Sequence, residues 1–328
     1  MKRSLLIHLE CPSCHQAFNL TVDKEEGAEV MEGKLSCACT SYPIVRGVPR
    51  LLPGTTDQKN WTTAERFGEE WKQFSMLTDK YEQQFLSWIE PVKQDHFRGK
   101  LVLDVGCGKG RHVLYAQKFG AQEVIGVDLS QAVDAAFDNV GRLPNAHIVQ
   151  ADLYKLPLKP EYDYAYSIGV LHHTPDPAKS FQCMVDKVKQ GGSVSAWIYG
   201  REGNGWIIYI LNPIRRITSK LPLPITKSLA FVLAVIMQAG LKVFYWPAEH
   251  VSWLGWMKKI LPYSAYLCSI ADYSFKENYS IVFDHLLPEI AFYIRQEEFQ
   301  KWFDDAKLQD VVITRRNNNS WRGFGSKI

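Results

Sequence analysis

The most constraining feature of the sequence is a glycine-rich segment at residues 101–110, Leu-Val-Leu-Asp-Val-Gly-Cys-Gly-Lys-Gly. An apolar run ends at Asp104, and three glycines follow at alternate positions. A strand that turns directly into a helix needs glycine there, because the backbone bends sharply and lets a ligand approach closely. The segment therefore predicts a strand, a ligand-binding turn and a helix over residues 111–119. A nicotinamide-binding fold would show a similar loop, so other segments must distinguish the two.

Four later segments are also predicted to be strands, at residues 123–128, 146–152, 162–169 and 192–199. The first two of them end on acidic residues, Asp128 and Asp152. Asp128 stands 24 residues after Asp104, which is the spacing at which a doubly wound fold places the carboxylate that holds ribose hydroxyls. A helix is predicted at 176–189, between the last two strands. This alternation predicts an α/β fold.

The strand at 162–169 leads into the motif Val170-Leu-His-His-Thr-Pro-Asp176. With the glycine loop and the acidic strand ends, this motif resembles the class I S-adenosylmethionine-dependent methyltransferases, in particular a subset that carries Val-Leu-His-His after the fourth strand. The resemblance covers residues 100–200. It implies a Rossmann-like, doubly wound sheet of seven strands with an antiparallel last strand. Residues 310–314, a turn at 317–319 and a strand to Ile328 would close that sheet.

The same resemblance implies S-adenosylmethionine as the cofactor, which needs acceptors for its ribose hydroxyls and its adenine amino group. By resemblance, Asp128 binds the ribose and Asp152 binds the adenine. Gly106 and Gly108 cradle the methionine part, and Asp104 holds the loop or the ammonium group. The competing interpretation is that the three acids only cap the helices after them. The predicted cofactor-binding residues are Asp104, Gly106, Cys107, Gly108, Gly110, Asp128, Leu129, Asp152, Leu153 and Ser167.

A second group of residues lies near the start of the sequence, where Cys11-Pro-Ser-Cys14 and Cys37-Ala-Cys39 are separated by 22 residues. Four thiolates arranged in this way suit a closed tetrahedral zinc site. A segment of about 50 residues is too small to bury a large core, so a metal would stabilise it. The predicted zinc ligands are Cys11, Cys14, Cys37 and Cys39.

With Tyr42-Pro-Ile-Val-Arg-Gly-Val-Pro-Arg-Leu-Leu52, this segment resembles the zinc-ribbon-like domain that activates tRNA and protein methyltransferases. The Cys37-Ala-Cys39 pair departs from the Cys-x-x-Cys spacing of that domain. A redox-active Cys-x-x-Cys is the alternative, but residues 1–54 lack the thioredoxin-like strand and helix that it needs.

These features divide the chain into a zinc-ribbon-like module at 1–54, a polar linker at 55–63, a cofactor-binding core at 64–200, a substrate or lid insertion at 201–294 and the rest of the core at 295–328. A helix at 296–303 is predicted to begin this last part. Aromatic residues recur at helical spacing from 64 to 90, which predicts an amphipathic helix packed on the core. By family analogy, that helix covers the cofactor cleft. Its aromatic residues are Phe67, Trp71, Phe74, Tyr81, Phe85 and Trp88.

The insertion has a net positive charge, unlike the rest of the chain. Residues 201–259 contain eight Lys or Arg and two acids, whereas the whole chain has a net charge of +3. Residues 228–241 form an almost continuous apolar run, which is shorter than the roughly 20 residues of a membrane span unless residues 243–246 extend it. Three interpretations are open: a helical lid packed on the core, a basic aromatic surface that contacts a membrane through residues 201–260, and a face for nucleic acid. The basic residues are sparse, which makes nucleic acid an unlikely partner.

Methyl transfer needs a base only where the acceptor atom arrives protonated. His172 and His173 stand where the fourth strand opens into the cleft, so either is a candidate base. The alternative is that the first histidine only packs beside the cofactor. Tyr199, Asp284 and His285 are further candidates. An acceptor that is already an unprotonated nitrogen would leave all of them without an acid–base role.

Together these inferences predict a methyltransferase that acts on a small molecule or on a lipid- or nucleotide-linked metabolite. The polar start of the sequence and the scattered cysteines at 107, 183 and 268 favour a cytoplasmic location, with peripheral membrane contact as one option. An rRNA or tRNA methyltransferase is one alternative, although the chain lacks the Asn/Asp-Pro-Pro-Tyr motif common in base-methylating enzymes. A non-catalytic adaptor that uses the zinc module to bind a partner is the other.

Overall fold

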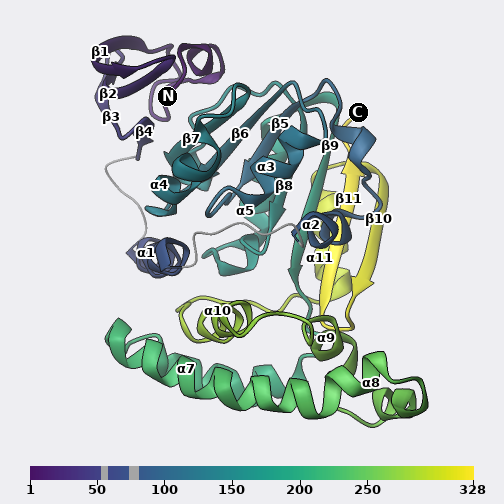
Figure 1. The fold of residues 1–328 in the computed structure, drawn as a ribbon. Helices are drawn as coiled ribbons and strands as arrows, with labels where there is room; N and C mark the ends of the chain where they lie inside the picture. The colour runs from purple at the N-terminus through teal and green to yellow at the C-terminus, as the bar shows by residue number, and fades with distance from the viewer. Residues whose placement is uncertain (53–57, 74–80) are drawn as a thin grey trace.

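The computed structural model describes residues 1–52, 58–73 and 81–328. In this part of the chain, eleven strands form one sheet in the order β1-β2-β3-β4-β7-β6-β5-β8-β9-β11-β10 (Figure 1). Strands β5 to β9 pair in parallel, and β11 runs antiparallel between β9 and β10. The core is therefore the predicted doubly wound sheet with an antiparallel last strand. Its seven strands are β5 (Leu101–Val105), β6 (Glu123–Asp128), β7 (Ala146–Ala151), β8 (Tyr162–Ile168), β9 (Val188–Tyr199), β10 (Gln309–Arg316) and β11 (Ser320–Ser326).

The whole sheet is larger than the predicted seven strands, because the N-terminal segment adds four more. β4 pairs in parallel with β7, with Arg50 opposite Gln150 and Leu51 opposite Ala151. A segment that is too short to bury a large core of its own gains one in this way, since it joins an existing sheet edge. The added strands are β1 (Asn19–Glu26), β2 (Glu29–Ser36), β3 (Ser41–Val45) and β4 (Val48–Leu51).

Side chains of the N-terminal segment also pack on the core. Leu5 and Leu9, in and just after the short helix η1 (Arg3–His8), are fully buried in the same apolar cluster as the core strands. The His8 imidazole lies between the carboxylates of Glu123 and Glu161, 2.6 Å from each. Residues 1–52 therefore form one packed unit with the sheet.

Helices cover both faces of the sheet (Figure 1), and the central strands are accordingly buried along their length, as all six residues of β7 are. Helix α5 begins where the sequence predicts, because the Asp176 side chain accepts a hydrogen bond from the Lys179 amide and Pro177 occupies the first turn. The covering helices are η2 (Gln94–Phe97), α3 (Arg111–Lys118), α4 (Ala132–Ala136), η3 (Phe137–Gly141), η4 (Leu153–Lys155), η5 (Leu171–His173), α5 (Pro177–Asp186) and α11 (Gln296–Asp305).

The predicted linker and the predicted aromatic helix differ from the structure. Helix α1 (Gln58–Gln73) begins inside the expected linker, since Gln and Lys at its start favour helix. The aromatic residues then belong to two helices, α1 and α2 (Tyr81–Ile89), instead of one. Residues 53–57 and 74–80, which include Phe74, lie outside the described residues.

The insertion after β9 is helical throughout its regular parts. Helix α10 lies between the long helix α7 and the sheet, and α7, η7 and α8 continue one another along the outer border of the molecule (Figure 1). The insertion's helices are η6 (Ile207–Leu211), α6 (Asn212–Thr218), α7 (Leu223–Gly240), η7 (Leu241–Tyr245), α8 (Trp246–His250), η8 (Ser252–Lys259), α9 (Ser264–Ser269) and α10 (Phe275–Leu286).

Candidate active site

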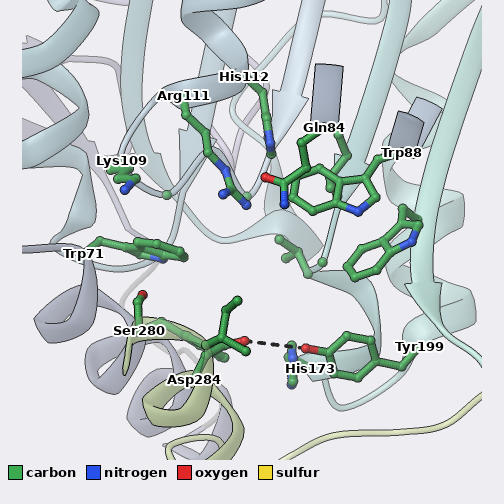
Figure 2. Close-up of a pocket in the computed structure, with 18 of the residues that line it drawn as sticks. Trp71, Gln84, Trp88, Lys109, Arg111, His112, His173, Tyr199, Ser280 and Asp284 are labelled. Atoms are coloured by element: carbon green, nitrogen blue, oxygen red, sulfur yellow. Dashed lines mark hydrogen bonds between the residues drawn. The ribbon is translucent and has the colours of Figure 1, made fainter. Parts of the chain in front are cut away.

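The carboxyl ends of β5, β6 and β8 open into a cavity of about 1310 Å³, and the insertion forms its opposite wall (Figure 2). Its walls come from the glycine loop, from α1 and α2, and from α9 and α10. Open α/β sheets bind their ligands at this edge. Sites for one small molecule usually occupy about 300–1,000 Å³, so this cavity has room for a cofactor and an acceptor together.

The glycine loop lines the cavity in a conformation that requires glycine. Gly106 has a φ of 83° and Gly108 a φ of 51°. A Cβ atom at Gly106 would lie 2.3 Å from Cγ2 of Val170, and one at Gly108 would lie 3.2 Å from Nε1 of Trp71. Both positions therefore require glycine, because of the positive φ and because Val170 and Trp71 pack closely on the loop.

Asp128, at the end of β6, is the best-placed acid for a ligand at this loop. Its Oδ2 accepts a hydrogen bond from the Gly108 amide at 2.9 Å, and its Oδ1 accepts two from Ser130, at 2.7 and 2.8 Å. Burial raises the pKa of Asp128, although these hydrogen bonds oppose the shift. The partly exposed carboxylate can still accept further bonds from a ligand's hydroxyl groups.

Four other predicted cofactor residues support the site without lining the cavity. Asp152 caps η4 through the Tyr154 amide, which is the role that the competing interpretation assigns to it. The Ser167 hydroxyl donates to the Val105 carbonyl, and Gly110 lets α3 pack closely on Ala136. The fourth residue is Asp104.

Asp104 is buried beneath the glycine loop, and neither of its carboxylate oxygens has a hydrogen-bond partner among the described residues. Burial, followed by the negative charge of Asp128, raises the pKa of Asp104 well above its ordinary value. The raised pKa favours the neutral form of this carboxyl, as expected for an acid that is buried beside a second acid. The other predicted residues, Cys107, Leu129 and Leu153, do line the cavity.

Two basic residues of the loop were missed by the sequence reasoning. Lys109 is buried, and its ammonium lies 5.3 and 5.1 Å from the ring centres of Trp71 and Tyr81. The Arg111 guanidinium lies 5.2 Å from Tyr81 and 4.9 Å from Trp88, and it points into the cavity (Figure 2). The Lys and Arg that flank Gly110 were the available signal, but only the packing of α1 and α2 shows that aromatic rings hold both cations.

The opposite wall of the cavity brings together two of the predicted catalytic residues. Tyr199, at the end of β9, donates a hydrogen bond of 3.5 Å to Oδ2 of Asp284 on α10 (Figure 2). Burial raises the pKa of Asp284 to about 6, against the opposing effect of Arg111. Burial also raises the pKa of Tyr199, so its hydroxyl stays neutral. A carboxylate with a pKa close to neutrality suits a general base.

The three predicted histidines differ in their access to the cavity. His172 does not line it, because this fully buried ring packs against Tyr199 with 4.0 Å between ring centres. Nδ1 of His173 donates to the Ile290 carbonyl at 2.7 Å, which leaves Nε2 as an acceptor on the cavity side. Burial lowers the pKa of His173 to about 3 and that of His285 to about 4. Both are therefore weaker bases than Asp284.

The four predicted zinc ligands meet at the N-terminal end of the molecule. Their Sγ atoms all lie within 4.8 Å of one another, with 3.6 Å between Cys11 and Cys39 and 3.7 Å between Cys14 and Cys37. Zinc–sulfur bonds of about 2.3 Å in a tetrahedron separate the sulfurs by about 3.8 Å. The donor set therefore fits zinc, and the Cys-x-Cys spacing does not prevent the four thiols from meeting.

The fold and the site define the class of protein: a Rossmann-like α/β fold with a glycine loop, an acid at the end of the second core strand and a large cavity above them. Residues 103–196 match the family described as Methyltransferase domain. This match confirms the predicted class of enzyme, a methyltransferase, for the part of the chain that holds the glycine loop and the acids.

Curated relatives match about a third of the chain. The tRNA U34 carboxymethyltransferase of Psychromonas ingrahamii is 31% identical over 113 residues, which cover 33% of this chain and 33% of that protein. The protein of the same name from Proteus mirabilis is 32% identical over 113 residues, with the same coverage. The chain thus spans about a third of the length of these relatives.

The chain is also similar to solved structures. One is an S-adenosylmethionine-dependent methyltransferase from Mesorhizobium loti, which is 31% identical with a TM-score of 0.30 over 32% of this chain and 48% of that chain. Another is human N-acetylserotonin methyltransferase in complex with S-adenosylmethionine, which is 13% identical with a TM-score of 0.48. The matched region is 84% of this chain and 60% of that chain. The assignment rests on the family match and the strand order.

Proposed function

We propose that the protein is an S-adenosylmethionine-dependent methyltransferase whose acceptor is a small molecule that carries a hydroxyl group. One observation supports this most directly: a single cavity joins the glycine loop and Asp128 at one end to Asp284 and Tyr199 at the other. The cofactor supplies an activated methyl group when it is bound. The remaining work, which is positioning and desolvation, falls to the residues of this chain.

At the cofactor end, Asp128 would accept the ribose hydroxyls, and Gly106 and Gly108 would admit the methionine part. Lys109 and Arg111 supply positive charge beside the loop, which suits the carboxylate of an amino acid. Asp104 lies beneath the loop and does not line the cavity, and its raised pKa favours the neutral carboxyl, so its role would be to support the loop and not to pair with the ammonium group.

At the acceptor end, Asp284 would accept the proton of the hydroxyl as the methyl group is transferred. Its raised pKa leaves the carboxylate mostly ionised at neutral pH yet able to hold a proton. The Tyr199 hydroxyl donates to the same carboxylate and keeps it oriented. The insertion covers this end of the cavity and so limits the entry of water.

A transfer assay tests this proposal. The purified protein is incubated with methyl-tritiated S-adenosylmethionine and a cell extract, and the label is followed in small-molecule, RNA and protein fractions. We expect label in the small-molecule fraction, and a decrease of about 10²- to 10⁴-fold for Asp284→Asn, because a general base contributes that much. The exposed acid Glu289, replaced in Glu289→Gln, is the matched control. An Asp284→Asn variant with the wild-type rate would refute the role of the carboxylate.

A tRNA methyltransferase is the second candidate, and the similarity to tRNA U34 carboxymethyltransferases is the observation that favours it. That similarity covers 33% of the chain, so most of the chain lies outside it. Label that appears in the RNA fraction and disappears after ribonuclease treatment would support this candidate against the small-molecule acceptor.

A further inference from the structure

The insertion exposes large apolar side chains on a scale found nowhere else among the described residues. Of the twenty-two large apolar side chains that are exposed there, seventeen lie between residues 206 and 260. Soluble monomers rarely expose contiguous apolar patches of more than a few hundred Å², and larger ones mark interaction sites. These seventeen residues, here called the apolar border, are Trp206, Tyr209, Ile210, Ile214, Ile217, Ile225, Phe231, Val232, Leu233, Val235, Ile236, Val243, Phe244, Trp246, Trp253, Trp256 and Ile260.

The long helix 223–250 is apolar on both of its sides, although only one side packs on protein. It is long and apolar enough to cross a membrane, yet only 22% of its most apolar stretch is buried. The packed side is a stripe that includes Thr226, Ala230, Ala234 and Leu241 and faces the rest of the insertion. A helix that is apolar all round is normally buried completely, either in a protein core or in lipid.

The opposite side of this helix forms a continuous ridge. The exposed fractions of Ile225, Val232, Ile236 and Val243 are 53%, 55%, 64% and 61%. Their spacing of seven, four and seven residues places them on one face of the helix. At 1.5 Å per residue the ridge is about 27 Å long. None of these four positions carries a polar group.

The charges and aromatic residues around the ridge indicate what covers it. Residues 203–271 contain seven Lys or Arg and a single acid, Glu249, which is paired with Lys258 at 2.7 Å. Arg216, Lys220 and Lys259 are exposed. The apolar border also holds tryptophan and tyrosine, which favour the boundary between water and lipid. Apolar residues flanked by basic ones are complementary to a bilayer with anionic headgroups.

We propose that the apolar border lies on an anionic lipid bilayer, with the ridge of the long helix in the plane of the membrane surface. The contact does not depend on the chemistry in the cavity. The helix lies on the bilayer instead of crossing it, because hydrogen bonds tie it to the rest of the insertion along its length. Asn278 donates to Gln238 at 2.7 Å, and Lys242 donates to the Ala271 carbonyl at 2.8 Å.

A second copy of the chain is a poorer fit for this surface. A two-fold interface brings the same patch of both subunits together, so the basic residues of one copy would face those of the other. The cores of such interfaces are depleted in lysine. An anionic bilayer meets the same residues with the opposite charge.

Co-sedimentation with vesicles tests the proposal on the full-length protein. Vesicles of phosphatidylcholine with 30% phosphatidylglycerol are compared with pure phosphatidylcholine at low and high salt. We expect binding to the anionic vesicles that weakens with salt, and a decrease of more than tenfold for Val232→Asp combined with Ile236→Asp. Reversing Lys220 or Lys259 to Glu should weaken binding roughly fivefold each. Val45→Asp, at an exposed apolar position of the N-terminal segment, is the matched control.

The remaining outcomes each contradict the proposal. The proposal is wrong if the wild-type protein does not bind anionic vesicles. It is also wrong if the double variant Val232→Asp with Ile236→Asp binds these vesicles as well as wild type does, with cofactor binding measured to show that the variant is folded. A solution dimer that this double variant dissociates would assign the surface to a second copy. Protein that stays in membranes after carbonate extraction would show that the helix crosses the bilayer.

Discussion

Replacing Asp128 by alanine tests the cofactor site most directly. Without the carboxylate, the two ribose hydroxyls of the cofactor would lose their hydrogen bonds to Asp128, and hydrogen bonds to charged groups contribute about 1.5–3 kcal/mol each. Because Asp128 is partly exposed to the cavity, we expect a total loss of about 2–3 kcal/mol. That loss corresponds to a dissociation constant roughly 30- to 150-fold higher. Isothermal titration calorimetry with S-adenosylmethionine and with its demethylated product measures it.

Two control variants separate a ligand contact from an effect on the loop. Ser130→Ala removes one of the three hydrogen bonds that Asp128 accepts from the protein, but no bond to a ligand, so we expect affinity within threefold of wild type. Asp138→Ala removes an exposed acid that pairs with Arg46 on the surface and should change nothing. An unchanged affinity in Asp128→Ala would refute the assignment. Equal losses in Asp128→Ala and Ser130→Ala would show that the acid acts only by shaping the loop.

Three further predictions follow from the geometry. Gly106→Ala should lower the free energy of unfolding, measured in urea, by about 2–4 kcal/mol, because alanine there combines a positive φ with a clash on Val170. Gly191→Ala is the control and should lower it by only about 1–2 kcal/mol, because Gly191 has a similar φ but no neighbour within 4 Å. Equal losses in the two variants would contradict the clash. The cysteine cluster should hold one zinc per chain, with sulfur at about 2.3 Å, in protein purified without chelator, and elemental analysis that finds no zinc in a folded protein would exclude the metal. The pKa of Asp284 is raised from 3.8 to about 6, so the folded state binds this proton more tightly than the unfolded state does. The wild-type protein should therefore lose stability relative to Asp284→Asn as the pH rises from about 4 to about 6. A difference between the two melting temperatures that stays constant over this range would contradict the pKa shift.

The sequence was sufficient to predict the core of the fold. The strands after residue 100 begin and end within a few residues of their predicted bounds, because buried parallel strands are rich in apolar residues and the glycine loop marks the carboxyl end of the first of them. The clustering of the four thiols was also predictable from spacing alone. In both cases the signal is local in the chain.

Features that depend on distant contacts could not be predicted in this way. The pairing of β4 with β7 joins residues about one hundred positions apart, so no local pattern predicts that the N-terminal strands extend the sheet of the core. The aromatic rings around Arg111 come from α1 and α2, which precede the loop by many residues. Asp284 approaches Tyr199 only because α10 folds back over the end of β9. The exposure of the ridge on α7 is likewise a property of packing, since composition alone is equally compatible with a buried helix.

The pairing of β4 with β7 has a consequence for how the protein can be shortened. Strand β7, with all six residues buried, would be the outermost strand of the parallel sheet if the first 54 residues were removed. A long apolar edge with unpaired amide and carbonyl groups is a template for self-association. The N-terminal segment therefore protects that edge. A fragment that starts after it would keep every residue placed here in the cavity, yet we expect it to aggregate.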